Sequence, residues 1–343
     1  MFGRKGLNVA EQTWILKRKG LLMTKIVTLL TILLGLVQIT PAQAEYPERA
    51  ITFIVPFSVG GGSDQTARAL IPFLEKHLGN GAKIAVVNKP GAGGSVAYAE
   101  MAGTKPDGYT IGMVNLPDAV TGPMLNANVG YTTSSFNYIG GINKEPSTIT
   151  VKADSPVKTL EEFITLARAK AGGLTVGVPS LSNVHSVGMT EFAAEAGLEV
   201  NKIPLNGGGP TMNALLGGHI DSASVSVGAA MKKKDKIRVI AQMSDERAET
   251  APNVPTTVEL GYKTTSYVIR SFAAPSGTPA PVMEKLRAAF RLAMDDPEFQ
   301  ATAKKQRIAL TFVPGDKLVE TAAELDTRLS KLWKTNPWMS KGN

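Results

Sequence analysis

The sequence predicts an α/β protein built as two lobes that are joined by two chain crossings. The chain has 343 residues and is 43% apolar, which is more than one hydrophobic core usually accommodates. Short β-rich runs alternate with segments whose apolar residues follow helical spacing, and this alternation occurs in two series. Three polar or glycine-rich loops each follow a predicted strand and precede a predicted helix, which is where ligands bind in open α/β sheets.

The first series begins with residues 51–55, a β-rich run that ends at Pro56 and is followed by a glycine cluster. Residues 64–77 then carry apolar side chains at helical spacing, which predicts a helix. The same order recurs as a strand, a helix and a strand at 83–87, 95–103 and 109–114. Strands that alternate with helices predict a parallel sheet that is covered on both faces.

The second series begins with a predicted strand at 148–151. Thr159 is followed three residues later by Glu162, and this capping box predicts a helix over 159–171. The other predicted strands of the series are 174–178, 200–204, 222–225 and 237–243. The other predicted helices are 184–196 and a segment that ends at Leu216.

The chain is predicted to become helical after a β-rich run at 267–273, with helices at 282–294, 297–305 and 316–333. This tail has too few strands to form an α/β domain of its own, so we expect it to pack on the first lobe. The first lobe would then comprise 45–150 plus 267–343, and the second lobe 151–266. Two lobes with two crossings between them enclose a cleft with a hinge.

Residues 1–44 differ in composition from the rest of the chain. From Met23, the expected true start, Lys25 precedes an apolar run at 26–37 and then small residues up to Ala44. This is the pattern of a secretory signal peptide that is cleaved after Ala44. The apolar run is shorter than the roughly 20 residues that a membrane-spanning helix needs, so a membrane anchor is the weaker interpretation.

The charge of the chain is concentrated in the segment that is predicted to be removed. The net charge of +8 falls to +3 once the six basic residues and the one acidic residue of 1–44 are removed. The basic run 232–234 has no interleaved aromatic residues, so we predict no nucleic-acid partner. The absence of cysteine excludes a thiol nucleophile and a lipid-anchored cysteine.

Three loops carry the residues that are expected to bind a ligand, at 58–64, 179–185 and 206–210. Glycine lets the backbone approach a ligand closely, and the free N–H groups at the start of the following helix carry partial positive charge. Such loops suit an anion. We favour a carboxylate over a nucleotide phosphate because the sequence has no G-x-x-x-x-G-K-[ST] motif.

The sequence offers no assembled catalytic group. It has no G-x-S-x-G motif, and the S-x-x-K match at 155–158 leads into a predicted surface helix. The histidines His77, His185 and His219 lack metal-ligand spacing. We therefore predict no catalytic residue, no metal, no cofactor and no enzymatic activity, and we leave His185 open between ligand contact and structural capping.

Several motifs together resemble a known family over essentially the whole chain after the signal. Near the start these are 46–49, 54–57 with Gly60 and Gly61, 64–68, 88–94 and 105–110; further on they are 208–210, 215–221, 252–256 and 274–279. With these motifs the chain resembles the Bug-type receptors of tripartite tricarboxylate transporters.

The resemblance implies a type II periplasmic-binding-protein (Venus flytrap) fold and a periplasmic, monomeric solute-binding protein. Such a receptor captures a small carboxylate-bearing metabolite in the interlobe cleft and delivers it to a large and a small integral-membrane subunit. A ligand-sensing receptor for a membrane sensor kinase is an alternative, and a secreted hydrolase is a weaker one. The hydrolase would require a nucleophile and a base that the sequence does not bring together.

The resemblance also points to particular ligand-binding residues in the three loops. These are Ser58, Gly60, Gly61, Asp64, Ser180, Ser182, Asn183, His185, Gly208 and Gly209. We assign Asp64 to capping its helix and bordering the site, because an acidic side chain does not hold an anion. Arg270 is expected either to pair with a distal carboxylate of the ligand or to form a structural ion pair at the lobe crossing.

Overall fold

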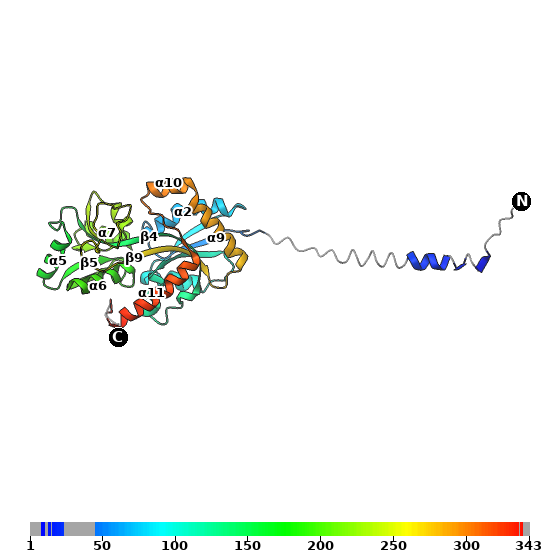
Figure 1. Cartoon of the computed structure of the whole chain (residues 1–343), viewed down its shortest axis with the longest axis horizontal. Helices are drawn as coiled ribbons and strands as arrows, with labels where there is room; N and C mark the ends of the chain where they lie inside the picture. The colour runs from blue at the N-terminus through cyan, green and yellow to red at the C-terminus, as the bar shows by residue number, and fades with distance from the viewer. Residues whose placement is uncertain (1–7, 11–12, 15, 24–44, 336, 339–343) are drawn as a thin grey trace. The chain divides into compact units, whose positions relative to one another are not determined.

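The computed structural model describes residues 8–10, 13–14, 16–23, 45–335 and 337–338 (Figure 1). The chain divides into two units, Met1–Glu45 and Tyr46–Asn343. In the first unit residues 16–23 are helical, while the predicted apolar run at 26–37 and the predicted cut after Ala44 lie outside the described residues. None of the described helices is both long enough and apolar enough to span a bilayer.

The first lobe is built as predicted around parallel strands. Strand β1 (Ile51–Val55) lies between β2 (Ile84–Asn88) and β3 (Thr110–Leu116) and pairs in parallel with both. The helices and turns that connect these strands and lead out of β3 are α2 (Gly62–Leu78), η1 (Ala92–Gly94), α3 (Ser95–Ala102), α4 (Asp118–Leu125) and η2 (Thr133–Ser135). Helix α4 was not predicted.

Two long strands carry the chain between the lobes. Strand β4 (Phe136–Lys152) leaves the first lobe and β9 (Tyr267–Pro275) returns to it, so the two pair antiparallel, and β9 is also antiparallel to β3. The predicted parallel pairing holds for β1, β2 and β3, but the sheet as a whole is mixed, because the returning strand β9 runs against the outgoing strand β4. Of β4 only residues 148–151 were predicted.

The second lobe repeats the strand-and-helix order. Its strand β5 (Leu174–Val178) pairs in parallel with β6 (Val200–Pro204) and β7 (Ser222–Ala223), and β8 (Ile237–Met243) pairs antiparallel with β4. The helices are α5 (Leu160–Ala169), α6 (Val184–Ala196), α7 (Gly208–Leu216) and α8 (Val227–Met231). The capping box is confirmed, since Thr159 Oγ1 accepts the Glu162 N–H at 3.2 Å and the Glu162 carboxylate accepts the Thr159 N–H at 3.2 Å.

The C-terminal elements are α9 (Ala280–Asp295), α10 (Pro297–Lys305), β10 (Val313–Pro314) and α11 (Gly315–Thr335). Leu286 and Phe290 of α9 share one buried cluster with Phe53 of β1, which confirms that the tail packs on the first lobe. The far end of α11 also reaches α6, where Arg328 pairs with Glu191 at 2.9 Å (Figure 1). This additional contact with the second lobe was not predicted.

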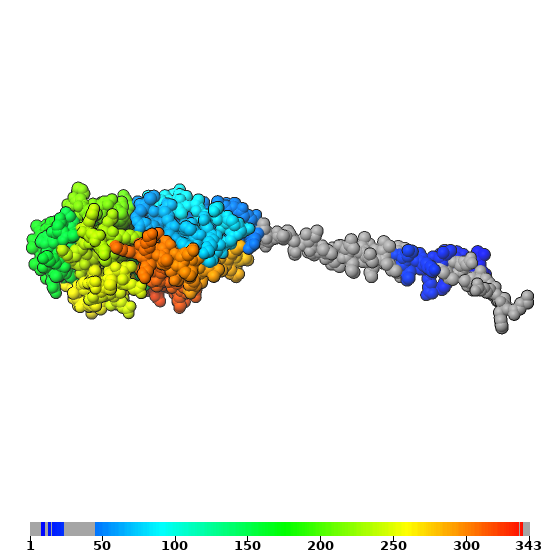
Figure 2. Space-filling view, turned by 90° about the horizontal axis from the view of Figure 1, so that it is seen from above, coloured from blue at the N-terminus to red at the C-terminus, as the bar shows by residue number. Residues whose placement is uncertain are grey.

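The two lobes share one continuous network of paired strands among the described residues. The strand order is β2-β1-β3-β9-β4-β7-β5-β6, with β8 and β10 paired to β4. In Figure 2 the green-to-yellow second lobe meets the blue, cyan and orange parts of the first lobe along one boundary. The predicted residue limits of the lobes, 45–150 plus 267–343 and 151–266, stay a prediction, because β4 runs without a break through residue 150.

Candidate functional site

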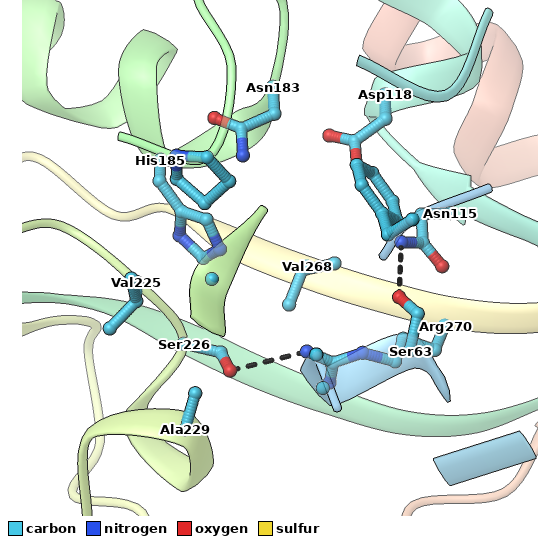
Figure 3. Close-up of a pocket in the computed structure, with 15 residues that line it drawn as sticks. Ser63, Asn115, Asp118, Asn183, His185, Val225, Ser226, Ala229, Val268 and Arg270 are labelled. Carbon is cyan, nitrogen blue, oxygen red and sulfur yellow. Dashed lines mark hydrogen bonds between the residues drawn. The ribbon is translucent and has the colours of Figure 1, made fainter. Parts of the chain in front are cut away.

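The loops that follow the strands meet at a small cavity between the lobes that is partly open to solvent. In Figure 3 Asn183 and His185 lie on one side of the cavity, and Asn115 and Asp118 lie on the other. The lining residues are Phe57, Gly61, Gly62, Ser63, Asn115, Asp118, Pro179, Asn183, His185, Gly208, Val225, Ser226, Ala229, Val268 and Arg270.

Five of the predicted ligand-binding residues line this cavity: Gly61, Asn183, His185, Gly208 and Arg270. The predicted residues Ser58, Gly60 and Gly209 instead line an adjoining outer opening, which shares Gly61, Gly62 and Gly208 with the cavity. The three predicted loops therefore do converge, but only some of their residues reach the buried space.

Ser180 and Ser182 lie away from this cavity. Their Oγ atoms are 2.7 Å apart and line a separate hollow beside Gly93 of the first lobe. A Cβ atom at Gly93 would lie 1.8 Å from Ser182 Oγ, so the positive φ of +66° is not the only reason for glycine there. This geometry does not favour the predicted ligand contact of Ser180 and Ser182. The tip of their loop faces the glycine turn at Gly93.

Asp64 holds the first glycine loop in place. Its side chain is buried, and its carboxylate accepts the Gly60 N–H at 2.9 Å, Arg68 Nε at 2.8 Å and Asn88 Nδ2 at 3.0 Å. Gly61 is the N-cap residue of α2, and Asp64 acts at the same helix start from three residues further on, by accepting the N–H of Gly60, which lines the outer opening. The carboxylate fixes the path of the loop toward the cavity.

Helices α2 and α7 present the start of their backbones to the cavity. The first N–H groups of a helix have no acceptor within it and carry partial positive charge. Gly62 and Ser63 of α2 and Gly208 of α7 line the space. Asn183 caps α6, with its Oδ1 accepting the Ser186 N–H at 3.1 Å, which leaves the Asn183 Nδ2 group as a further donor.

Gly62 lies against Arg270, and this contact gives a first testable result. A Cβ atom at Gly62 would lie 2.6 Å from Arg270 Nη2 and 3.3 Å from Cζ, so Gly62→Ala must displace the guanidinium. We expect binding of the ligand to weaken about tenfold or more, as measured by calorimetric titration. Gly103→Ala is the matched control, because its Cβ would meet only ordinary contacts from 3.5 Å. Equal affinity in both variants would contradict the role given to this contact.

Arg270 forms the charged floor of the cavity. It is 4% exposed and pairs with Glu145 of β4 through Nη1, while Nη2 donates to Ser226 Oγ at 3.2 Å. Its Nε atom is buried without a hydrogen-bond partner among the described residues. Of the two alternatives for Arg270, the structural ion pair is present, and the same side chain also faces the ligand cavity.

His185 connects the cavity to the two crossing strands. Its Nδ1 lies 2.7 Å from Ser147 Oγ of β4, and Ser147 Oγ lies 2.9 Å from Ser266 Oγ, immediately before β9. Burial, helped by the nearby charge of Arg270, lowers the pKa of His185 to about 3, so the imidazole is neutral at physiological pH. His185 braces the two strands that cross between the lobes and also lines the cavity, and its ligand contact stays a prediction.

Asn115 and Asp118 are site residues that were not predicted. Asn115 lies near the end of β3 and Asp118 is the first residue of α4, so the two flank a strand-to-helix junction like those of the three predicted loops, but Pro117 and the absence of glycine there hid the junction. Asp118 is buried, which raises the pKa of its carboxyl to about 7, although the Val184 N–H bond and Arg270 act in the opposite direction. A polar residue near the end of a strand, with a second one three positions later at the start of a helix, was the signal that could have identified them.

Direct bonds join the lobes around the cavity. The Val184 N–H donates to Asp118 Oδ1 at 3.0 Å, and Ser58 Oγ donates to the Asn206 carbonyl at 3.0 Å. Lys232 of the second lobe donates to Gln65 of the first lobe beside the outer opening. The lobes are therefore closed on each other in this structure.

Residues 66–332 match the family model of the tripartite tricarboxylate transporter family receptor, TctC. The chain belongs to this receptor family. The resemblance to Bug-type receptors is confirmed, and the TctC chain is a solute-binding receptor.

The UPF0065 protein of the gbd 5' region of Cupriavidus necator is 33% identical over 295 residues, which cover 83% of this chain and 87% of that protein. Protein BugT of Bordetella pertussis is 29% identical over 247 residues, 70% of this chain and 75% of that protein.

Solved structures share the fold of this TctC chain. A TctC solute binding protein from Polaromonas is 29% identical with a TM-score of 0.64, covering 84% of this chain and 99% of that one. The periplasmic binding protein BugD is 27% identical with a TM-score of 0.77, covering 85% and 98%. MatC from Rhodopseudomonas palustris with bound malate is 25% identical with a TM-score of 0.75, covering 84% and 99%. The predicted two-lobed type II periplasmic-binding-protein fold is confirmed.

Proposed function

We propose that this TctC receptor captures a small carboxylate in the cavity between its lobes and delivers it to a tripartite transporter. The observation that carries the proposal is the convergence of α2, α7 and Arg270 on one buried space. Ligand contacts are proposed for the five predicted residues that line it, namely Gly61, Asn183, His185, Gly208 and Arg270.

The donors around the cavity suit a carboxylate. Backbone N–H groups at two helix starts supply directed bonds and partial positive charge, and the guanidinium of Arg270 adds a donor with full charge. Hydrogen bonds to a charged group are stronger than those between neutral groups, typically by about a factor of two. The malate bound to MatC, whose solved structure is 25% identical in sequence to this chain, supports a carboxylate as the class of ligand.

The cavity hydroxyls favour binding over catalysis. Asn115 Nδ2 donates to Ser63 Oγ at 3.0 Å, and Arg270 donates to Ser226 Oγ at 3.2 Å, so each serine faces a donor rather than a base. A serine nucleophile needs a base that takes its proton. We therefore propose a receptor without enzymatic activity, metal or cofactor.

The cellular context is proposed from the signal sequence and the family. The chain would be cleaved after Ala44 and act in the periplasm as a monomer, with no nucleic-acid partner. Its protein partners would be a large and a small integral-membrane subunit. A soluble receptor of this kind raises the local concentration of its ligand at the transporter.

Delivery to a transporter is tested by uptake in cells. We expect deletion of the receptor gene, or of the genes for the two membrane subunits, to abolish uptake of the radiolabelled carboxylate that the purified receptor binds. A plasmid-borne wild-type receptor should restore uptake, and Gly62→Ala should restore it only at higher substrate concentration. Normal uptake without the membrane subunits, despite tight binding by the receptor, would contradict the transport role.

A further inference from the structure

The cavity contains hydrogen-bond acceptors that a simple carboxylate cannot satisfy. A carboxylate ligand offers only acceptors of its own, so it pairs with the helix N–H groups and with Arg270. Asp118, Asn115 and His185 line the same space and are acceptors there. These acceptors therefore constrain which hydrogen-bonding groups the ligand carries besides its carboxylate.

Asn115 provides the first of these acceptors. Its side chain is 2% exposed, and its Nδ2 donates to Ser63 Oγ at 3.0 Å. A serine hydroxyl can accept or donate, but the amide also donates to the Asp118 carboxylate, so Nδ2 is the donor end and Oδ1 is the acceptor. This Oδ1 atom is buried and has no hydrogen-bond donor among the described residues. Buried polar atoms without a protein partner are rare, which points to a donor supplied by a ligand.

His185 provides the second acceptor, as a count of protons shows. Ser266 Oγ donates its one proton to the Val184 carbonyl at 3.1 Å, so it can only accept from Ser147 at 2.9 Å. Ser147 has then given its own proton to Ser266 and must accept from His185 Nδ1, 2.7 Å away. The neutral ring thus carries its proton on Nδ1, and Nε2 is left with a free lone pair.

Asp118 provides the third acceptor. Its carboxylate is 3% exposed and receives the Val184 N–H on Oδ1 at 3.0 Å. Arg270 and the Val184 N–H favour its ionised form, but burial outweighs them and raises its pKa to about 7. A donor or a cation on the ligand would stabilise the ionised form, whereas a second negative charge beside it would favour the protonated form.

We propose that the ligand of this receptor carries, besides its carboxylate, a hydrogen-bond donor in the form of a hydroxyl or an ammonium group that faces Asp118, Asn115 and His185. This inference rests on the proposed function, because it takes the carboxylate to be held by α2, α7 and Arg270. The donor satisfies acceptors that the protein leaves open, of which Asn115 Oδ1 is buried without a partner among the described residues. An unsubstituted acid leaves them unpaired and binds about 10- to 100-fold more weakly.

The test is a calorimetric titration of the purified receptor with matched acids. Mono- and dicarboxylic acids of three to six carbons are each used unsubstituted, hydroxylated and aminated; propionate, lactate and alanine form one set, and succinate, malate and aspartate another. On the carbon skeletons that bind, the hydroxy or amino acid should bind about 10- to 100-fold more tightly than the unsubstituted acid.

The possible outcomes separate the inference from the proposed function. Unsubstituted acids that bind as tightly as their hydroxy and amino counterparts would overturn the inference and leave carboxylate capture intact. If no acid of any skeleton binds, the proposed function itself fails, and the inference fails with it.

Asp118→Asn distinguishes the two kinds of donor. The amide oxygen of the variant still accepts the Val184 N–H, but the negative charge is gone. A preference for the amino acid should fall about tenfold or more in this variant, whereas a preference for the hydroxy acid should fall less. If the preference for hydroxy or amino acids over unsubstituted acids is unchanged in both Asp118→Asn and His185→Asn, these side chains do not accept from the ligand and the inference is overturned.

Discussion

Arg270→Met is expected to destabilise the ligand-free receptor by about 3–5 kcal/mol. Glu145 is 4% exposed, and its pairing with Arg270 is what compensates its buried charge. Gly228 of α8 packs directly on the Glu145 carboxylate, where a Cβ atom would lie 2.1 Å from Oε1. Removing only the cation leaves an uncompensated buried charge. Urea denaturation measures the loss in free energy of unfolding.

The control for this prediction removes both charges. In Arg270→Met/Glu145→Met no buried charge is left unpaired, and replacing a buried ion pair by apolar residues is often nearly neutral. We expect the double variant to recover most of the lost stability while ligand affinity stays low, because Arg270 lines the cavity. A double variant that is as unstable as Arg270→Met would show that the ion pair is not the cause.

Asp118 and His185 are expected to give opposite pH dependences of stability. Burial raises the pKa of Asp118 from 3.8 to about 7, so the folded state keeps a proton that the unfolded state releases, and the free energy of unfolding falls between about pH 4 and 7. Burial lowers the pKa of His185 from 6.5 to about 3, so the free energy of unfolding falls as pH decreases from about 6.5 to 3. The two trends offset each other over the shared range.

Single variants should reveal each trend separately in the ligand-free receptor. A pKa difference of about 3 corresponds to about 4 kcal/mol at full effect. His185→Asn should lose up to this amount from pH 4 to 7, and Asp118→Asn should gain up to this amount from pH 3 to 6.5. Urea denaturation at intervals of one pH unit measures both, with Asp154→Asn as a control at a 75% exposed side chain. If both variants keep the wild-type dependence of the free energy of unfolding on pH, the assigned protonation states are contradicted.

The alternation of strands and helices was predictable because local periodicity determines it. The β-rich run at 51–55 and the Thr159 capping box are confirmed as β1 and the start of α5. Strand β4 was largely missed because Gly140, Gly141 and Pro146 interrupt its β-rich pattern. It forms through pairing with β9, which lies more than one hundred residues away in the sequence and leaves no local signal.

The candidate site was predictable only in part, for a related reason. Glycine loops indicate where a backbone approaches a ligand, and Gly61 and Gly208 do line the cavity. The direction in which a loop tip points depends on its tertiary neighbours, so Ser182 faces Gly93 instead. Asn115 and Asp118 become site residues because β3 lies beside β1 and β9, a relation that periodicity does not encode.

Calorimetric titration of the purified receptor with a carboxylate and its neutral carboxamide tests the capture of a carboxylate most directly. The pair differs in charge and hardly in shape, so it isolates the contribution of the N–H groups of α2 and α7 and of Arg270. The carboxylate should bind saturably at one site, and the amide about 10- to 100-fold more weakly, since hydrogen bonds to charged groups contribute about 1.5–3 kcal/mol. An amide that binds as tightly as the acid would contradict carboxylate recognition by this cavity.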